Sequence, residues 1–157
     1  MINYSYIFHF VTALGMVTLF MFVDFNTISP GANDNLTGTY AAVCALRMLD
    51  MAGVDFENTE VCAMITDGEE AGLRGCKSWA KNHYDEYVNS GVETVVLCVD
   101  TLTDREYLRV YNKDMTGTVK NNQQFSQLVM DASKDAGHDD IELSSVFFGS
   151  SDAAAFS

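Results

Sequence analysis

The first 23 residues contain no Asp, Glu, Lys or Arg, and this uncharged start constrains the chain more than any other feature. A helix of about 20 apolar residues crosses the hydrocarbon core of a bilayer, so the run over residues 2–23 is long enough. It lacks the basic start and the small-residue cleavage site of a signal peptide. A buried helix or strand pair of a soluble core is the alternative, but few such elements extend this far without a charge. We expect residues 1–25 to form a transmembrane segment.

Composition limits the partners of the rest of the chain, residues 26–157, whose length suits one domain. Asp and Glu number 22 against 9 Lys and Arg, and the formal net charge is −13. Such a chain cannot replace the counterions of a nucleic acid, so we expect no DNA or RNA partner. An anionic membrane surface would also repel it. No Lys or Arg flanks the apolar run, so the positive-inside rule gives no orientation.

The four cysteines share no Cys-x-x-Cys spacing and lie in apolar surroundings: Cys44, Cys62, Cys76 and Cys98. A disulfide framework or a zinc knuckle therefore has little support. We expect them to be small core residues in a reducing compartment.

Predicted helices and strands alternate along the acidic part. Apolar periodicity predicts helices over residues 36–51, 76–87 and 120–136, and strands over 60–66, 94–99, 107–111 and 141–148. Alternation of this kind is typical of an α/β fold. We expect a three-layer sandwich in which a mostly parallel or mixed central sheet has helices on both faces.

Acidic residues follow the predicted strands, where ligands bind in such sheets. Glu69 and Glu70 follow the 60–66 strand, Asp100 ends the 94–99 strand, and Asp34 precedes the first helix of the domain. Each has an ordinary alternative, as a helix cap, a first-turn acid or a turn residue. Gathered carboxylates repel one another without a cation, and their oxygens suit Mg, Ca or Mn, or zinc when imidazole joins them.

Four motifs carry a resemblance. Residues 30–38 read Pro-Gly-Ala-Asn-Asp-Asn-Leu-Thr-Gly, residues 69–75 read Glu-Glu-Ala-Gly-Leu-Arg-Gly, residues 96–100 end a strand in Asp, and residues 149–156 contain Ser-Asp followed by Phe156. In this order they resemble the co-catalytic di-zinc aminopeptidases of the MH clan of metallopeptidases. The order of all four motifs is far more specific than any one of them.

The resemblance implies a role for each acid. Asp34 would bridge two zinc ions, Glu70 would bind one zinc and Asp100 the other, and Glu69 would be the general base that takes a proton from the zinc-activated water. Asp152 would support the substrate end of the site. The reaction implied is hydrolysis of the N-terminal peptide bond of a peptide substrate, for which two zinc ions suit the chemistry.

The sequence departs from the family pattern at two histidine ligands. A His-x-Asp segment is expected just before Pro30, where residues 24–27 hold no His, and a Tyr-His segment is expected after the last motif. His83 precedes Tyr84-Asp85 but lies at the wrong place, so we interpret it as solvent-facing; His138 lies in an acidic turn and should be exposed.

Two explanations for the missing first histidine stay open. Asp24 could replace it, which would give an all-carboxylate site with a weaker preference for zinc. Alternatively, membrane helices are inserted before Pro30, as in some family members, and the chain is an internal fragment whose histidines lie outside it. We favour the second, with the protein in a membrane and the catalytic part in the cytoplasm.

The sequence thus predicts a metal-dependent exopeptidase with no activity of its own if both histidines are needed. Two alternatives remain open: a non-catalytic, membrane-anchored binding domain of the same fold, and an acyltransferase resembling the glutaminyl cyclases. Fold likeness alone cannot separate them, because function depends on the site.

Overall fold

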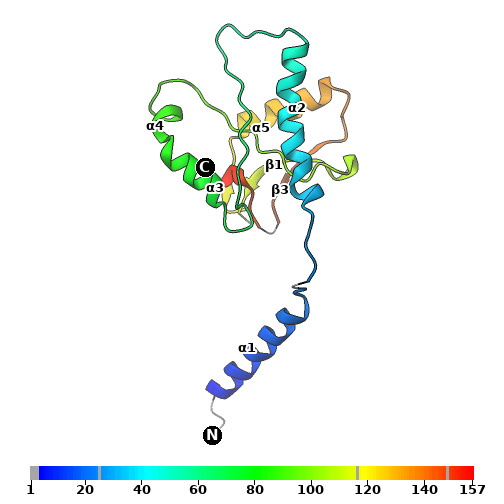
Figure 1. Ribbon diagram of the computed structural model, residues 1–157, viewed down its shortest axis with the longest axis vertical. Helices are drawn as coiled ribbons and strands as arrows, with labels where there is room; N and C mark the ends of the chain where they lie inside the picture. Colours follow the sequence, from blue (N-terminus) through cyan, green and yellow to red (C-terminus); the bar gives the residue numbers. More distant parts are fainter. Residues whose placement is uncertain (1–3, 25, 116, 148) are drawn as a thin grey trace. The chain divides into compact units, whose positions relative to one another are not determined.

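The computed structural model describes residues 4–24, 26–115, 117–147 and 149–157 (Figure 1). The chain divides into two compact units, Met1–Gly31 and Ala32–Ser157.

The first unit is a single helix, α1 (Tyr4–Met21), and none of its residues is buried. Its mean hydropathy of 1.4 over 18 residues makes it long and apolar enough to cross a membrane. The Thr12 hydroxyl donates to the carbonyl of Phe8, and the Thr18 hydroxyl donates to that of Leu14. The helix therefore satisfies these polar groups internally, as a hydrocarbon environment requires. The predicted apolar N-terminal helix is confirmed.

The second unit combines helices with a small mixed sheet. Its α-helices are α2 (Thr37–Met51), α3 (Arg74–Asn82), α4 (Tyr84–Tyr87) and α5 (Gln123–Asp135), and its strands are β1 (Arg109–Asp114), β2 (Val119–Lys120) and β3 (Glu142–Ser145). The described residues also form two short helical turns, η2 (Arg105–Tyr107) and η3 (Asp152–Phe156), and η1 (Ala32–Leu36) is irregular because Asp34 and Asn35 have non-helical backbone angles. The strand order is β2-β1-β3, with β1 antiparallel to β2 and parallel to β3. The predicted α/β class and mixed sheet are confirmed.

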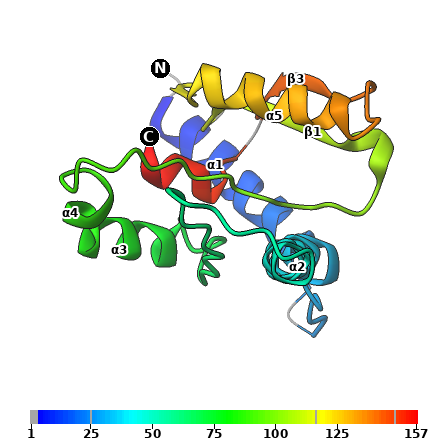
Figure 2. The ribbon, with the colours of Figure 1, turned by 90° about the horizontal axis from the view of Figure 1, so that it is seen from above.

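Contacts between the elements bring distant parts of this unit together. Helix α5 packs against β1 and β3, and η3 packs against α3. Figure 2 shows η3, in red, beside the green α3. Helix α5 begins where the Asn122 side chain accepts a hydrogen bond from the Phe125 N–H, which satisfies a free donor of its first turn. The chain is thus folded so that its C-terminal turn lies next to the helix that follows Glu70.

Three predicted elements differ in detail. The helix predicted over 76–87 is divided into α3 and α4, because His83 leaves the helical region with φ −110° and ψ 15°. The strand predicted over 107–111 lies later, as β1, and is central rather than near an edge because it pairs on both sides. The last predicted strand is shorter, as β3, and residue 148 lies outside the described residues.

The two strands predicted over residues 60–66 and 94–99 are not present as strands, and both segments are extended coil (Figure 1). Their apolar side chains are partly exposed, with Ile65 at 59% and Leu97 at 58%, and partly half-buried, as at Met64 and Val96. An apolar run indicates that a segment is buried, but a strand also needs a neighbouring strand that pairs with its backbone N–H and C=O groups. In the described residues, these two segments have no such ladder, and only part of the burial that the pattern predicts is present.

The buried apolar residues of the described chain are few: Leu73, Cys76, Ala80 and Met130. Beside them, Trp79 stacks on His83 with ring centroids 4.6 Å apart and on Tyr87 at 5.9 Å, and its edge meets Phe156 at 6.0 Å. This aromatic group attaches η3 to α3 and α4. The core cysteine prediction holds for Cys76, whereas Cys44 and Cys62 are exposed, because they lie on surfaces that no other described element covers.

Candidate active site

Carboxylates from four separate segments gather around Glu69. The Glu69 side chain is half-buried, and desolvation is the main cause that raises its pKa above the ordinary value. The negative charges of Glu70, Asp152, Asp100 and Asp34 raise that pKa further. Every charge that acts on Glu69 in this way is negative. The acids singled out in the sequence are therefore within electrostatic reach of Glu69.

Asn35 connects the loop that carries Asp34 to the segment that carries Asp100. Its Nδ2 donates to the carbonyl of Val99 at 2.9 Å. Its Oδ1 accepts from the backbone N–H of Gly38 at 3.0 Å and from that of Thr101 at 3.3 Å. One amide side chain thereby fixes the residues on both sides of Asp100 relative to the neighbour of Asp34. Asp34 and Asp100 are themselves exposed.

Two glycines of the motifs allow these close approaches. A Cβ atom on Gly38 would lie 2.2 Å from the Val99 carbonyl oxygen, and one on Gly75 would lie 2.3 Å from that of Asp67. Real side chains do not tolerate such distances to backbone atoms, so larger residues would force the two segments apart. Gly38 keeps α2 against the end of the 94–99 segment, and Gly75 keeps α3 against the start of the Glu69 loop.

The loop that carries Glu69 and Glu70 is closed by its own backbone. The N–H groups of Gly72 and Leu73 both donate to the Glu69 carbonyl, at 2.9 and 2.8 Å. The Gly75 N–H donates to the Asp67 carbonyl at 3.1 Å. Leu73 adopts a left-handed φ of 60° and is only 4% exposed, so its side chain anchors the loop in the core. The loop thus presents Glu69 and Glu70 from a fixed turn before α3.

Asp152 joins the site from the C-terminal motif. Its Oδ2 accepts a hydrogen bond from the Thr66 hydroxyl at 2.6 Å, and its carbonyl oxygen accepts one from the Cys76 thiol at 3.5 Å. Burial is the main cause that raises the pKa of Cys98, and that side chain also interacts with Ser151. The segment before Asp100 therefore packs against the segment that contains Asp152.

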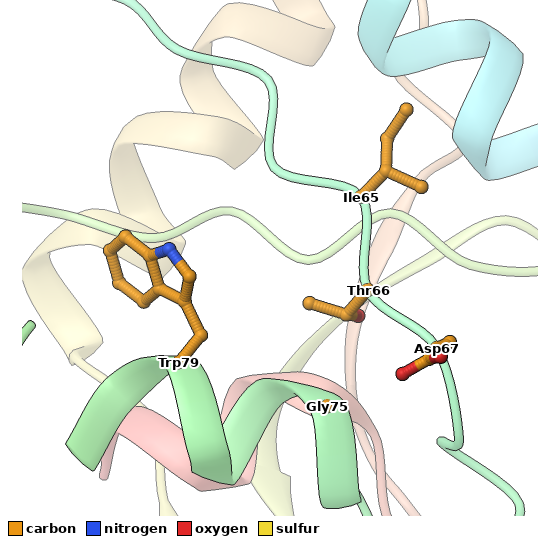
Figure 3. Close-up of a pocket in the computed structure, with 5 residues that line it drawn as sticks. All are labelled: Ile65, Thr66, Asp67, Gly75 and Trp79. Carbon is orange, nitrogen blue, oxygen red and sulfur yellow. The ribbon is translucent and has the colours of Figure 1, made fainter. Parts of the chain in front are cut away.

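A pocket of about 350 Å³ lies next to this site. Figure 3 shows its lining, which comes from the segment that precedes the Glu69 loop and from α3: Ile65, Thr66, Asp67, Gly75 and Trp79. The indole of Trp79 faces it from α3, opposite the side chains of Ile65 and Thr66. The pocket thus has an apolar wall and one carboxylate, and it lies close to the acids around Glu69.

A divalent metal ion fits this group in the chemistry of its donors. Carboxylate oxygens are the ligands that hard cations prefer, and they also bind zinc. The ion pairs between described residues involve none of Asp34, Glu70 and Asp100. The Oδ1 atom of Asp152 is buried and has no hydrogen-bond partner among the described residues. No three His, Cys, Asp or Glu side chains in the described ranges lie as a ready metal-binding group, so a cation would have to draw the exposed carboxylates together.

The histidines are not placed as the sequence predicted. His83 is half-buried rather than solvent-facing, because it stacks on Trp79 and its Nδ1 lies 3.0 Å from Oε2 of Glu86. His138 is also half-buried rather than exposed, because its turn folds back on α5 through its backbone N–H, which donates to Ser133. His9 lies in α1, in the other unit.

Comparison with known families decides the class. The model of peptidase family M28 matches residues 16–157, a range that includes all four motifs and the whole second unit. The chain belongs to peptidase family M28. Comparisons with curated proteins and with solved structures gave no match. The M28 family consists of metal-dependent peptidases, and the resemblance read from the sequence is confirmed.

Several residues that support the candidate site were missed in the sequence. Asn35 and Gly38 lie inside the first motif, where their positions next to Asp34 could have suggested a structural role. Thr66 directly precedes the second motif. Asp114 gave no signal, because an acid at the end of an amphipathic strand is normally exposed, whereas here it is 1% exposed.

Proposed function

We propose that this M28 chain acts as an aminopeptidase, hydrolysing the N-terminal peptide bond of a peptide substrate with two zinc ions. The observation that carries the proposal is the group of four carboxylates around Glu69, in which every charge acting on Glu69 is negative. Negative charges that act together on Glu69 favour the binding of a divalent cation, which would offset them. The family supplies the reaction class, a metal-dependent peptidase.

In this proposal Asp34 would bridge the two ions, Glu70 would hold one and Asp100 the other. Bound zinc polarises a peptide carbonyl and makes water a better nucleophile at neutral pH. The three side chains are exposed, so they are free to turn toward an ion. Asn35 keeps the backbones of Asp34 and Asp100 at a constant separation, through its contacts with Val99 and Thr101.

Glu69 is the general base of the proposal. A base works best when its pKa lies near the working pH, and desolvation together with four negative neighbours raises the pKa of Glu69 in that direction. Its carboxylate would accept the proton of the attacking water and return it to the leaving amine. Glu69 and Glu70 can divide the two roles because adjacent side chains point in different directions.

We further propose that residues 2–23 span a membrane and that the catalytic unit lies on the cytoplasmic side. The support is the length and hydropathy of α1, whose side chains are all exposed. Carbonate extraction of expressing cells would leave the chain in the membrane, and protease added to sealed inverted vesicles would digest the second unit. Release of the chain by carbonate, or protection of that unit, would contradict the proposal.

The activity is tested with an aminoacyl anilide as substrate, on this chain and on the longest chain that its gene encodes, since the resemblance expects two further histidine ligands. We expect Glu69→Gln to keep its zinc and to lose about 100-fold or more of kcat. Glu57→Gln, which changes an exposed acid outside the group, is the matched control. Full activity of Glu69→Gln would overturn the role of Glu69. Cyclisation of an N-terminal glutamine peptide without hydrolysis would indicate the acyltransferase instead.

A further inference from the structure

The most deeply buried charged side chain in the described residues belongs to Asp114, at the end of β1, which is 1% exposed. Its carboxylate accepts hydrogen bonds from the backbone N–H of Ser151 at 3.1 Å, from the Ser151 hydroxyl and from the Met115 N–H. All of these donors are neutral. Burying a carboxylate is costly unless its hydrogen bonds are satisfied, and two of these bonds come from Ser151, so the carboxylate holds that residue by both its backbone and its side chain.

Ser151 is followed directly by Asp152, the first residue of η3. Asp152 in turn accepts the hydrogen bond of the Thr66 hydroxyl at 2.6 Å. Thr66 stands three residues before Glu69, on the segment that enters the loop (Figure 3). A continuous series of contacts therefore runs from Asp114 through Ser151 and Asp152 to Thr66.

This series connects the end of β1 to the segment that enters the Glu69 loop. The far end of the loop is held by the Gly75 N–H, which donates to Asp67, and by the buried Leu73. The segment before Asp67 is held by the Thr66 hydroxyl, which donates a hydrogen bond to Asp152. The loop is thus held on both sides, and the Thr66 hydroxyl before it and the Cys76 thiol after it both bond Asp152, the neighbour of Ser151.

We propose that Asp114 is a positioning residue for Glu69: through Ser151 and Asp152 it holds Thr66, and thereby sets where the Glu69 loop lies relative to β1. The proposal rests on the function proposed above, in which Glu69 is the base. Asp114 itself touches no reacting group. The same series also places Asp152, whose charge is among those that act on Glu69.

The test measures amide hydrogen exchange of Gly72 and Leu73 in the full chain in detergent, because both N–H groups donate to the Glu69 carbonyl. Ser151→Ala and Thr66→Val each remove one hydroxyl of the series without a change in size. We expect either variant to speed exchange of these two amides by about fivefold, the effect of losing one hydrogen bond. Thr66→Ser should restore slow exchange, and Ser90→Ala, which changes an exposed serine with no contact to the series, should not alter it.

Two results would overturn the proposal: unchanged exchange at Gly72 and Leu73 in both variants, or an equal increase over α2 and α5, which would indicate a general loss of stability. Asp114→Asn, which keeps the size but turns an acceptor into a donor toward Ser151, should reproduce the local change if it folds. Amide exchange does not require catalytic turnover, so a failure of this proposal is distinguishable from a failure of the proposed function. In an active chain, Ser151→Ala should lower kcat with KM unchanged.

Discussion

The side-chain amide of Asn35 bonds the carbonyl of Val99 at 2.9 Å, across 64 residues of sequence. This contact, with the two that its oxygen accepts, ties the first motif to the third. Asn35 positions two exposed acids, Asp34 and Asp100. Neither acid forms an ion pair with a basic side chain of the described residues. The arrangement of the acidic group therefore depends on a neutral residue between them.

Replacing Asn35 tests that dependence. Asn35→Ala removes three hydrogen bonds and leaves the part-buried Val99 carbonyl without its partner. We expect the free energy of unfolding, measured by urea denaturation, to fall by about 1–3 kcal/mol. Asn89→Ala, which removes one exposed contact with Asp85, should cost much less. Equal stability of the two variants would contradict the role of Asn35.

The two motif glycines should be intolerant of any side chain. Gly38→Ala and Gly75→Ala each place a Cβ within 2.3 Å of a backbone oxygen, and we expect each to lower the free energy of unfolding by about 1–3 kcal/mol. Gly15→Ala, where no atom lies within 4 Å, is the control for the added methyl group, and it should not lower the free energy of unfolding because Ala favours a helix more than Gly does. Wild-type stability of Gly38→Ala or Gly75→Ala would show that the backbones are not as close as described.

Stability of the metal-free chain should depend on the pH through Glu69. Because its pKa is raised in the folded state, chiefly by desolvation and then by Glu70, the folded chain binds this proton more tightly than the unfolded chain. The stability that it contributes is complete below the unfolded pKa and is lost as the pH rises through the folded pKa. In chelator-treated buffer, Glu69→Gln should therefore be more stable than wild type at about pH 7 and equal to it at about pH 3.

The control for that experiment is Glu57→Gln, whose urea denaturation should follow the wild type at both pH values. A Glu69→Gln variant less stable than wild type at neutral pH would reverse the predicted sign, and would mean that the ionised form of Glu69 is stabilised by the fold.

The cysteines should differ in reactivity. Burial is the main cause that raises the pKa of the Cys76 thiol to about 12, with the charge of Asp152 adding to it. The reactive form of cysteine is the thiolate, so Cys76 should stay unmodified by iodoacetamide at about pH 8 in the folded chain. The exposed Cys44 should react within the same period, and the exposed Cys62 more slowly, because its hydrogen bond to Glu60 raises the pKa of its thiol. Peptide mass spectrometry gives the extent of labelling at each site, and rapid labelling of Cys76 before unfolding would contradict its burial.

The sequence predicted helices better than strands, for a physical reason. The 3.6-residue periodicity of α2 and α5 indicates a helix, whose backbone hydrogen bonds are all internal to the segment. Both helices therefore begin and end within a few residues of the predicted bounds. The segments over 60–66 and 94–99 show the apolar pattern of strands, but a strand depends on a partner that no local pattern contains. His83 likewise ends α3 through its backbone angles, which its neighbours in sequence did not reveal.

The acids of the candidate site were predicted from the sequence because they lie in four motifs whose order resembles that of the family. Their supports could not, because they depend on contacts between distant residues. Thr66 meets Asp152 over 86 residues, and Ser151 meets Asp114 over 37. Nothing in the local sequence of Asp114 distinguishes it from an exposed acid, and only the fold shows that its carboxylate is buried.

Zinc titration of the chelator-treated full chain by calorimetry tests the central claim most directly. The claim is that Asp34, Glu70 and Asp100 bind a divalent metal beside Glu69. We predict saturable zinc binding to the wild type and to Glu57→Gln. The affinity for zinc should be weakened by more than about tenfold in Asp34→Asn, Glu70→Gln and Asp100→Asn. Absence of binding, or equal affinity in all five proteins, would contradict it.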